Sequence, residues 1–196
     1  MARTRDLPAT WVTATTTELP PSDRPEIAFC GRSNVGKSSL INALCRQKKL
    51  LRTSGTPGRT RMIHLVAVAD RIHLVDLPGY GYARVGHAER DAWGQMVEDY
   101  LGERPALAGV VLIVDARLPP QDADIHLRRA LVDTHLPVLG VATKIDGVPR
   151  SKQRAQLEVL RRALDFPPGR PLPFSVEGSQ GRDALWDAID EMTGRP

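Results

Sequence analysis

Cysteine is scarce in this sequence, and its two residues stand at no spacing that suits a metal. Cys30 lies in an apolar, strand-like run and Cys45 at the end of a helix-like one, without the CxxC or Cys/His spacing of zinc sites. We therefore expect two buried free thiols and no zinc centre.

Long apolar runs are also missing. The longest, residues 110–114 and 138–142, fall far short of the roughly 18 residues that a membrane-spanning helix needs. The first residues, MARTRDLPATW, lack the apolar stretch of roughly 7 to 15 residues that is typical of a signal peptide. We expect a cytoplasmic protein that does not enter a membrane.

What is present is the composition of a folded domain. The 196 residues are 41% hydrophobic and 26% charged, enough for one core but short for two domains of ordinary size. The net charge is +4, and residues 46–61 alone hold six basic side chains and no acidic one. Such a run is either a solvated loop or a contact for a polyanionic partner, and composition leaves both interpretations open.

Short apolar runs with strand character alternate along the chain with stretches of helical period, which is typical of an open α/β sheet. The break at residues 69–71 is too short for a crossover helix, so the flanking strands should form an antiparallel hairpin at a sheet edge. We expect a three-layer sandwich around a mostly parallel six-stranded sheet. Residues 1–25 should form an arm anchored by Trp11 and Val12, and residues 26–196 a single domain. The expected strands are 26–30, 63–69, 72–76, 110–114, 138–142 and 172–174, and the expected helices include 37–45, 122–134 and 151–164.

The most specific motif is GRSNVGKSS, which fits the phosphate-loop pattern GxxxxGK[ST] and lies between an expected strand and an expected helix. Its glycines let the backbone curl so that N–H groups point inward, and the helix start adds its positive dipole end. Lys37 adds a full charge near the β and γ phosphates, and Ser38 can ligate Mg²⁺. The expected nucleotide contacts in this loop are Gly31, Arg32, Ser33, Asn34, Val35, Gly36, Lys37, Ser38 and Ser39.

A DxxG pattern follows at the end of another expected strand, formed by Asp76, Leu77, Pro78 and Gly79. The carboxylate of Asp76 can orient a Mg²⁺-bound water, while the N–H of Gly79 can meet a γ phosphate. The pattern alone is weak, but after a phosphate loop it indicates nucleoside triphosphate chemistry.

A TKID segment places Thr143, Lys144 and Asp146 at the carboxyl end of an expected strand, where open α/β sheets bind ligands. A carboxylate at Asp146 can accept hydrogen bonds from guanine N1–H and the exocyclic amine, whereas adenine has an acceptor at N1. A site built to hydrogen-bond one group rejects an analogue lacking it by about 10⁴ to 10⁵. The segment therefore favours GTP over ATP, with the stem of Lys144 lying along the purine.

Two simpler interpretations apply to this end of the site. The TKID segment is also compatible with a strand-to-helix turn that uses Asp146 as a cap. The segment after the last expected strand, Phe174, Ser175 and Val176, can offer a backbone N–H to guanine O6 or form a plain loop.

Together these motifs resemble translation-factor-type GTPases. The runs DLPGYGYA at residues 76–83 and TPGRT at residues 56–60 narrow the resemblance to the EngB family, also called YihA or YsxC, of the TrmE-Era-EngA-EngB superfamily. The resemblance extends to Trp11-Val12-Thr13 in the arm, to VDAR at residues 114–117 with Asp124, and to the closing Phe174-Ser175.

This resemblance implies a Ras-like fold and Mg²⁺-dependent hydrolysis of GTP to GDP. It implies further nucleotide contacts from Gly58, Arg59 and Thr60, with Thr60 ligating Mg²⁺ beside Ser38 and Asp76. The implied catalytic residues are Lys37, Thr60 and Gly79. The resemblance also implies a role in large-ribosomal-subunit assembly, through contacts with rRNA and ribosomal proteins, and in normal septation and cell division.

Some positions depart from better-known GTPases. Tyr80 stands where Ras-like enzymes have the glutamine that orients the attacking water, so we expect slow intrinsic turnover. Asn34 either helps to bind K⁺, as in related GTPases, or stabilises the loop through its own backbone bonds. Thr143 replaces a common asparagine, although its hydroxyl can tie this segment to the phosphate loop, and Gly147 stands where a lysine is usual.

Three other functions share part of this pattern. An ATP-dependent kinase or ATPase shares the phosphate loop but has no use for TKID. A non-catalytic rRNA-binding module explains residues 46–61 but leaves the loop idle. A polymerising division GTPase needs an assembly domain that is not apparent in so short a chain, and we expect a monomer.

Overall fold

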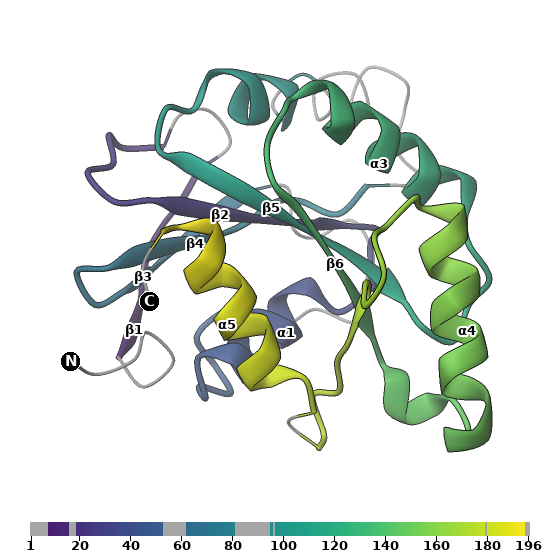
Figure 1. Ribbon diagram of the computed structural model, residues 1–196. Coiled ribbons are helices and arrows are strands. Elements are labelled where there is room, and N and C mark those ends of the chain that lie inside the picture. The colour runs from purple at the N-terminus through teal and green to yellow at the C-terminus, as the bar shows by residue number, and fades with distance from the viewer. Residues whose placement is uncertain are drawn as a thin grey trace.

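A computed structural model describes residues 8–15, 19–52, 62–80, 95, 97–178 and 180–194 of the chain. These residues form three layers, with a twisted sheet between two layers of helices (Figure 1). The expected α/β sandwich is confirmed. None of the helices in this part of the chain is long and apolar enough to cross a membrane.

The elements follow the alternation that the sequence predicts, with ends shifted by a few residues at most places. The strands are β1 Ala9–Thr15, β2 Glu26–Gly31, β3 Ile63–Val68, β4 Ile72–Asp76, β5 Leu107–Asp115, β6 Val138–Thr143 and β7 Leu172–Pro173. The helices are α1 Lys37–Leu44, α3 Asp122–Asp133, α4 Arg150–Ala163 and α5 Arg182–Met192, with a 3-10 turn, η2, at Ile145–Gly147. Residues 97–103 are also helical.

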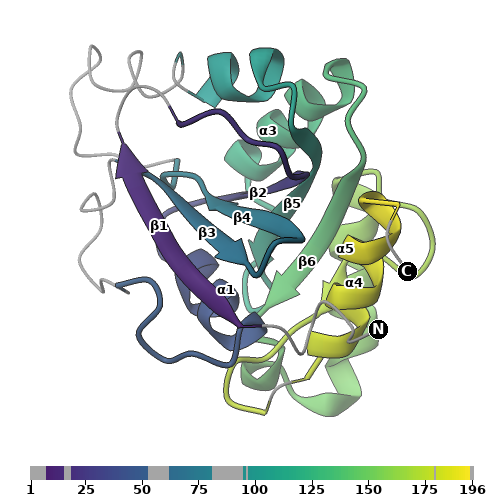
Figure 2. The same ribbon diagram turned by 90° about the vertical axis from the view of Figure 1, so that its left-hand side faces the viewer.

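The sheet has seven strands in the order β1-β3-β4-β2-β5-β6-β7, and not the expected six. β3 and β4 form the expected antiparallel hairpin, but β1 pairs antiparallel with β3 and becomes the outermost strand (Figure 2). Trp11 and Val12 do not anchor this segment by burial, since they are 47% and 43% exposed. Backbone pairing with β3 and the buried Ala9 hold it instead.

Two apolar cores lie on opposite faces of the sheet. Successive side chains of a strand point to opposite faces, so Val111 and Ile113 of β5 pack into the core that α1 and α5 cover. Val110 and Leu112 pack into the other core, beneath residues 97–103, α3 and α4. A strand covered on both faces reads as a continuous apolar run, which explains why β5 is so apolar.

The two cysteines differ in burial. Cys30 is buried in β2 as expected, but Cys45 is only partly buried at the end of α1. Burial raises the pKa of each thiol to about 12. Both are free and protonated at neutral pH, and the described residues contain no cluster of three or more acidic, histidine or cysteine side chains suited to a metal.

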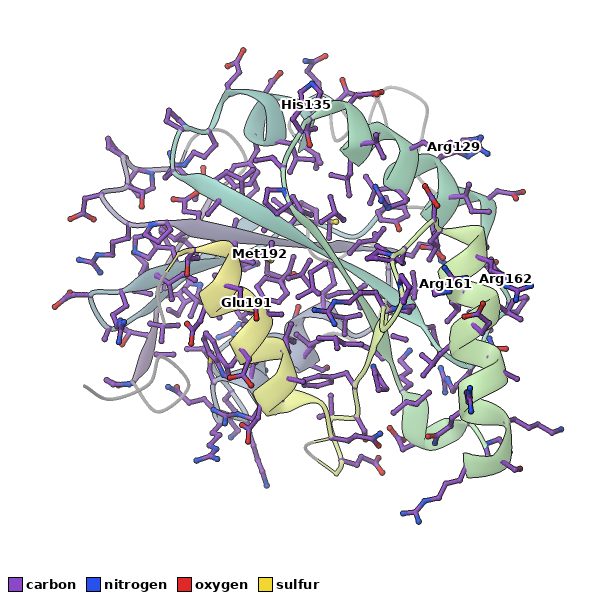
Figure 3. The ribbon with its side chains drawn as sticks, viewed as in Figure 1. Arg129, His135, Arg161, Arg162, Glu191 and Met192 are labelled. Carbon is purple, nitrogen blue, oxygen red and sulfur yellow. The ribbon has the colours of Figure 1, made fainter. Side chains whose placement is uncertain are left out.

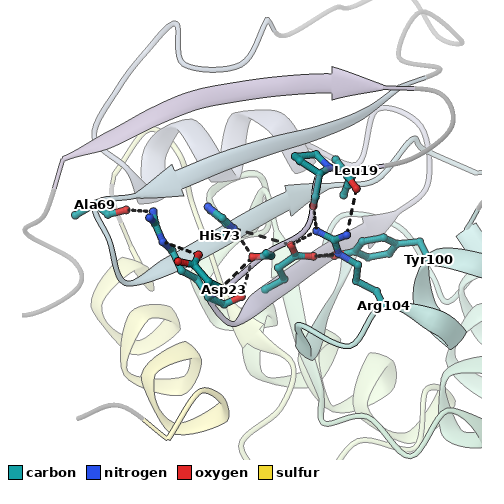
Figure 4. A network of polar contacts seen from close by, with 10 residues as sticks. Leu19, Asp23, Ala69, His73, Tyr100 and Arg104 are labelled. Carbon is teal, nitrogen blue, oxygen red and sulfur yellow. Dashed lines mark hydrogen bonds and ion pairs between the residues drawn. The ribbon is translucent and has the colours of Figure 1, made fainter.

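A buried polar network fastens the helix at residues 97–103 to the start of β2 (Figure 4). The carboxylate of Glu26 is fully buried and accepts two hydrogen bonds from the Arg104 guanidinium, at 2.9 and 2.7 Å. The Tyr100 hydroxyl donates to the same carboxylate at 2.9 Å, and Arg104 also donates to Leu19 O at 3.3 Å. This network lies at the amino end of β2, at the opposite end of the strand from the phosphate loop.

Candidate functional site

The carboxyl ends of β2, β5 and β6 meet at one edge of the sheet because these strands run parallel. The GRSNVGKSS loop follows β2, and the TKID segment follows β6. The sequence places these motifs more than a hundred residues apart. The parallel sheet brings them together.

The phosphate-loop backbone requires glycine at two places. A Cβ on Gly31 would lie 2.6 Å from Ile113 O, so any side chain there would collide with β5. Gly36 has φ 103°, a left-handed conformation, directly before α1 begins at Lys37. No described side chain caps α1, and its first turn has no acidic residue, so its N–H groups suit an anionic ligand.

Ser38 and Asp76 meet beneath this loop. Ser38 Oγ donates to Asp76 Oδ2 at 2.5 Å, and Asp76 is 1% exposed. Asp76 Oδ1 is buried without a hydrogen-bond partner among the described residues. Burial raises the pKa of Asp76, while the charge of Lys37 and the Ser38 hydrogen bond oppose that rise. A hydroxyl beside a carboxylate with an unmatched oxygen fits a Mg²⁺ ion and its water ligands.

The DxxG segment, Asp76 to Gly79, rests against the phosphate loop at its far end. Ser33 N–H donates to Tyr80 O at 3.0 Å, and a Cβ on Gly79 would lie 2.9 Å from Ser33 Cα. Only glycine therefore permits this approach. Gly79, which is expected from the sequence to meet a γ phosphate, thus lies directly against the phosphate loop.

The Tyr80 side chain belongs to a buried cluster with Asp124 and with Arg32 of the phosphate loop. Its hydroxyl donates to Asp124 Oδ1 at 2.7 Å, while Arg32 Nε lies 3.4 Å from Asp124 Oδ2. Tyr80 and Asp124 are 8% and 3% exposed. Burial raises the pKa of both groups. Tyr80 thus connects the end of the DxxG segment to Asp124 of α3, which also pairs with Arg32 of the phosphate loop.

The TKID segment is bonded directly to the phosphate loop. Thr143 Oγ1 donates to Val35 O at 2.7 Å, which confirms that the hydroxyl ties the two segments together. Lys144 Nζ donates to Asn34 O at 2.6 Å and to Asp115 Oδ2 at 2.9 Å. The segment and the loop therefore form one unit that holds Lys144 in place.

Asp115 organises this unit, although its role is not apparent from the motifs. Burial raises its pKa, but hydrogen bonds from Arg117 and Lys144 outweigh burial and hold that pKa at about 2. Arg117 contacts both oxygens, through Nε at 3.0 Å and Nη2 at 2.9 Å. A Cβ on Gly147 would lie 2.7 Å from Arg117 Cδ, so the arginine stem fills the space beside that glycine.

The last segment of the site is more restricted than the sequence suggests. Ser175 is 1% exposed, and its N–H donates to Gln180 O at 3.1 Å. Phe174 is fully buried and its N–H donates to Ala142 O. Val176 is 45% exposed, so of the three residues expected here it is the one whose surroundings leave room for a base. Asp146 is exposed in η2, as a base-binding carboxylate requires.

Part of the expected site lies outside the described residues. This part includes Gly58, Arg59 and Thr60, the rest of TPGRT, and the DLPGYGYA motif beyond Tyr80. The first half of the basic stretch is described, and Arg46, Lys48, Lys49 and Arg52 are exposed there. Asn42 supports that loop by exchanging two hydrogen bonds, each 2.8 Å long, with the backbone of Leu51.

Comparisons with known proteins identify relatives that are described as GTP-binding proteins. The family model described as "50S ribosome-binding GTPase" matches residues 26–144. The chain is 48% identical over 181 residues to a probable GTP-binding protein EngB of Anaeromyxobacter sp. (strain Fw109-5), covering 88% of this chain and 84% of the relative. It is 43% identical over 179 residues to the probable GTP-binding protein EngB of Bacillus subtilis (strain 168), covering 91% and 92%.

Solved structures show the same fold at low identity. A crystal structure of a probable GTP-binding protein engB has a TM-score of 0.72 at 22% identity, covering 86% of this chain and 98% of that one. Era in complex with MgGDPNP and nucleotides 1506–1542 of 16S ribosomal RNA has a TM-score of 0.68 at 20% identity, covering 86% and 56%. The expected Ras-like fold is confirmed.

Proposed function

The chain belongs to the EngB family of GTP-binding proteins, and on that premise we propose that it acts as a conformational switch in large-ribosomal-subunit assembly. As a P-loop GTPase of this family, it binds guanine nucleotide and hydrolyses GTP to GDP. The observation that carries the proposal is the contact of the DxxG segment with the phosphate loop, because a γ phosphate would alter it.

The phosphates are proposed to bind the N–H groups of residues 31–39 and the Lys37 side chain. Ser38, Thr60 and Asp76 are the proposed holders of Mg²⁺, Asp76 through water. The unmatched buried oxygen of Asp76 beside the Ser38 hydroxyl supports this choice. Bound Mg²⁺ would supply positive charge to the β and γ phosphates.

The base is proposed to lie beside the TKID segment. Asp146 would accept from guanine N1–H and the exocyclic amine, while the Lys144 stem covers the purine face. Lys144 is already held by Asn34 and Asp115, so little side-chain order remains to be imposed on binding. Val176 would donate its N–H to guanine O6.

Nucleotide state is proposed to control two segments. With GTP bound, Thr60 and the Gly79 N–H would be held by Mg²⁺ and the γ phosphate, and hydrolysis would release them. The basic stretch 46–61 leads into the first of these segments. Its exposed side chains at residues 46, 48, 49 and 52 support a contact with rRNA phosphates.

Further proposals concern the setting of this activity. Residues 26–196 form the GTP-binding domain, and residues 1–25 an arm of which residues 9–15 extend the sheet. We expect a monomer that works in the cytoplasm, in contact with rRNA and ribosomal proteins. Any effect on septation or cell division would then follow from ribosome supply.

The switch is tested by pelleting ribosomal large-subunit precursors with the protein bound to a nonhydrolysable GTP analogue or to GDP. We expect tighter binding with the GTP analogue, and weaker binding in both states as salt rises. Equal affinity in the two states would refute the switch. Pelleting of the protein with GTP but without particles would instead indicate a polymerising GTPase, and preserved particle binding by nucleotide-free protein a non-catalytic RNA-binding module.

Potassium is a second proposed cofactor of the phosphate loop. Asn34 is exposed, and none of the described residues hydrogen-bonds its side chain, which disfavours a loop-stabilising role for the amide. Its φ of 63° is a conformation that asparagine tolerates better than most residues. We expect faster GTP turnover in KCl than in NaCl, because a bound cation can act where other GTPases use an arginine. Equal rates would remove K⁺ from the mechanism.

A further inference from the structure

A second basic surface lies on α4, apart in sequence from the stretch 46–61. A groove of about 850 Å³ runs between this helix and the segment that leads into β7. Five arginines and a single acidic residue line it. These side chains are Arg150, Arg154, Arg161, Arg162, Arg170 and Glu158.

The one carboxylate is already neutralised by two of these arginines. Arg161 donates to both oxygens of Glu158, at 2.7 and 2.9 Å, and Arg162 Nε donates at 2.7 Å. These hydrogen bonds lower the pKa of Glu158 to about 2, so it stays ionised at neutral pH. Arg161 also donates to Phe166 O at 3.1 Å, so that side chain braces the wall of the groove.

The other arginines keep donors for a ligand. Arg150 and Arg154 have neither a hydrogen bond nor an ion pair with any described residue, and both are exposed. They lie one helical turn apart on one flank of α4. Arg162 lies on the same helix (Figure 3). It is eight residues, or about two turns, beyond Arg154, which gives the row a length of roughly 18 Å from Arg150. Arg170 lines the groove from the facing segment.

The chemistry of this groove favours a phosphate chain. Planar guanidinium groups bind phosphate through paired hydrogen bonds, and arginine is preferred over lysine in such contacts. A row of arginines with one more arginine on the facing wall suits a ligand that carries several phosphate groups in succession. A bilayer surface is flat and would not follow a concave groove, and interfacial binding also relies on an apolar face that inserts into lipid.

We propose that the α4 groove, defined by Arg150, Arg154, Arg162 and Arg170, binds the phosphate backbone of RNA in the ribosomal partner. This inference rests on the proposed function. Because α4 contains neither nucleotide-controlled segment, the groove contributes equally in the GTP and GDP states. It holds the particle while the stretch 46–61 responds to the nucleotide.

The test compares two double variants of equal charge. Arg150→Gln with Arg154→Gln removes two donors of the groove, while Arg129→Gln with Lys152→Gln removes two exposed charges elsewhere. Arg129 lies on α3, and Lys152 lines a separate hollow on the other flank of α4. None of these side chains belongs to the proposed nucleotide site. Unchanged binding of a fluorescent GDP would therefore show that each variant folds.

Binding is measured with ribosomal precursor particles and with an RNA duplex of roughly 20 base pairs. Each phosphate contact adds about 0.7 to 0.9 to the slope of log affinity against log salt, so the groove variant should lower that slope by about 1.4 to 1.8. Over the tenfold change from about 1 M to about 0.1 M salt, this difference in slope corresponds to a roughly 25- to 60-fold difference in affinity. The control variant should keep most of the affinity and slope of the parent protein.

The outcomes separate this inference from the switch itself. If the groove variant loses affinity by the same factor in both nucleotide states, the inference stands, whatever the ratio between states. An unaltered salt slope, or equal losses in the two double variants, would overturn the groove as an RNA site. Stronger binding of the groove to polyglutamate or to phosphatidylserine vesicles than to RNA would overturn it as well. A parent protein with equal particle affinity in both states would refute only the proposed switch.

Discussion

Replacing Tyr80 with phenylalanine removes one hydroxyl and leaves the ring in place. That hydroxyl donates to Asp124 Oδ1 at 2.7 Å, and both residues are buried. A hydrogen bond to a charged group contributes about 1.5 to 3 kcal/mol. We call the DxxG segment docked when it contacts Ser33 of the phosphate loop, as it does here. Loss of the Tyr80 hydrogen bond should make this docked arrangement less stable by the same amount. Since about 1.4 kcal/mol is a factor of ten, the equilibrium away from the docked position should shift roughly 10- to 150-fold.

This shift should change the preference of the protein for GTP over GDP. Ser33 N–H donates to Tyr80 O in the docked arrangement, with Gly79 against the same residue. If a γ phosphate must displace this contact, Tyr80→Phe should raise affinity for a nonhydrolysable GTP analogue relative to GDP, by at most the factor above. Titration with fluorescent derivatives of the two nucleotides measures this ratio.

Tyr100→Phe is the matched control. Its hydroxyl also donates to a buried carboxylate, Glu26, but at the amino end of β2 (Figure 4). Both variants should lower the free energy of unfolding in urea, and only Tyr80→Phe should change the nucleotide ratio. An unchanged ratio for a folded Tyr80→Phe protein would mean that the Tyr80–Asp124 bond persists in both states, and the displacement argument would be wrong.

Three further predictions concern the nucleotide site. Asp146→Asn should change base preference from guanine toward xanthine, and competition between GTP and XTP measures it; unaltered GTP preference would contradict the base assignment. Ser38→Ala should weaken GDP binding much more with Mg²⁺ than with EDTA, and an equal loss would remove Ser38 as a metal ligand. Asp115→Asn should weaken GDP binding by about three- to tenfold, because Lys144 and Arg117 lose a charged partner. The depressed pKa of Asp115, about 2, means that its stabilising contribution is present above its unfolded pKa and lost as pH falls toward 2. Acid unfolding of Asp115→Asn should therefore show a smaller stability loss over that range than the parent protein.

The sequence alone predicts most of the sheet and the identity of the motifs, because each motif is a local requirement of the backbone. A loop that encloses phosphate needs Gly31 and Gly36 next to Lys37 and Ser38, whatever the rest of the chain does. The expected contact of the Thr143 hydroxyl with the phosphate loop is also confirmed. Strands covered on both faces leave continuous apolar runs, so β2, β5 and β6 are visible in the sequence.

Other features depend on how distant segments meet. β1 exists because its backbone pairs with β3, and the apolar alternation of ATWVTAT is interrupted between Trp11 and Thr13, where the pairing register shifts. Tyr80 and Asp124 are 44 residues apart, and Lys144 and Asn34 are 110 apart, so no local pattern links them. The same holds for Arg170, which faces the arginines of α4 only after the chain has turned back toward β7.

The division between the two sources of information is therefore physical. Loop chemistry and apolar periodicity are properties of neighbouring residues, and they determined the nucleotide motifs and the α/β class of this chain. The partner of each buried polar group depends on the path of the whole chain, because burial makes an unmatched donor or acceptor costly and the packed fold decides which group can reach it. Only the tertiary structure could assign Asp124 to Tyr80 and Asp115 to Lys144.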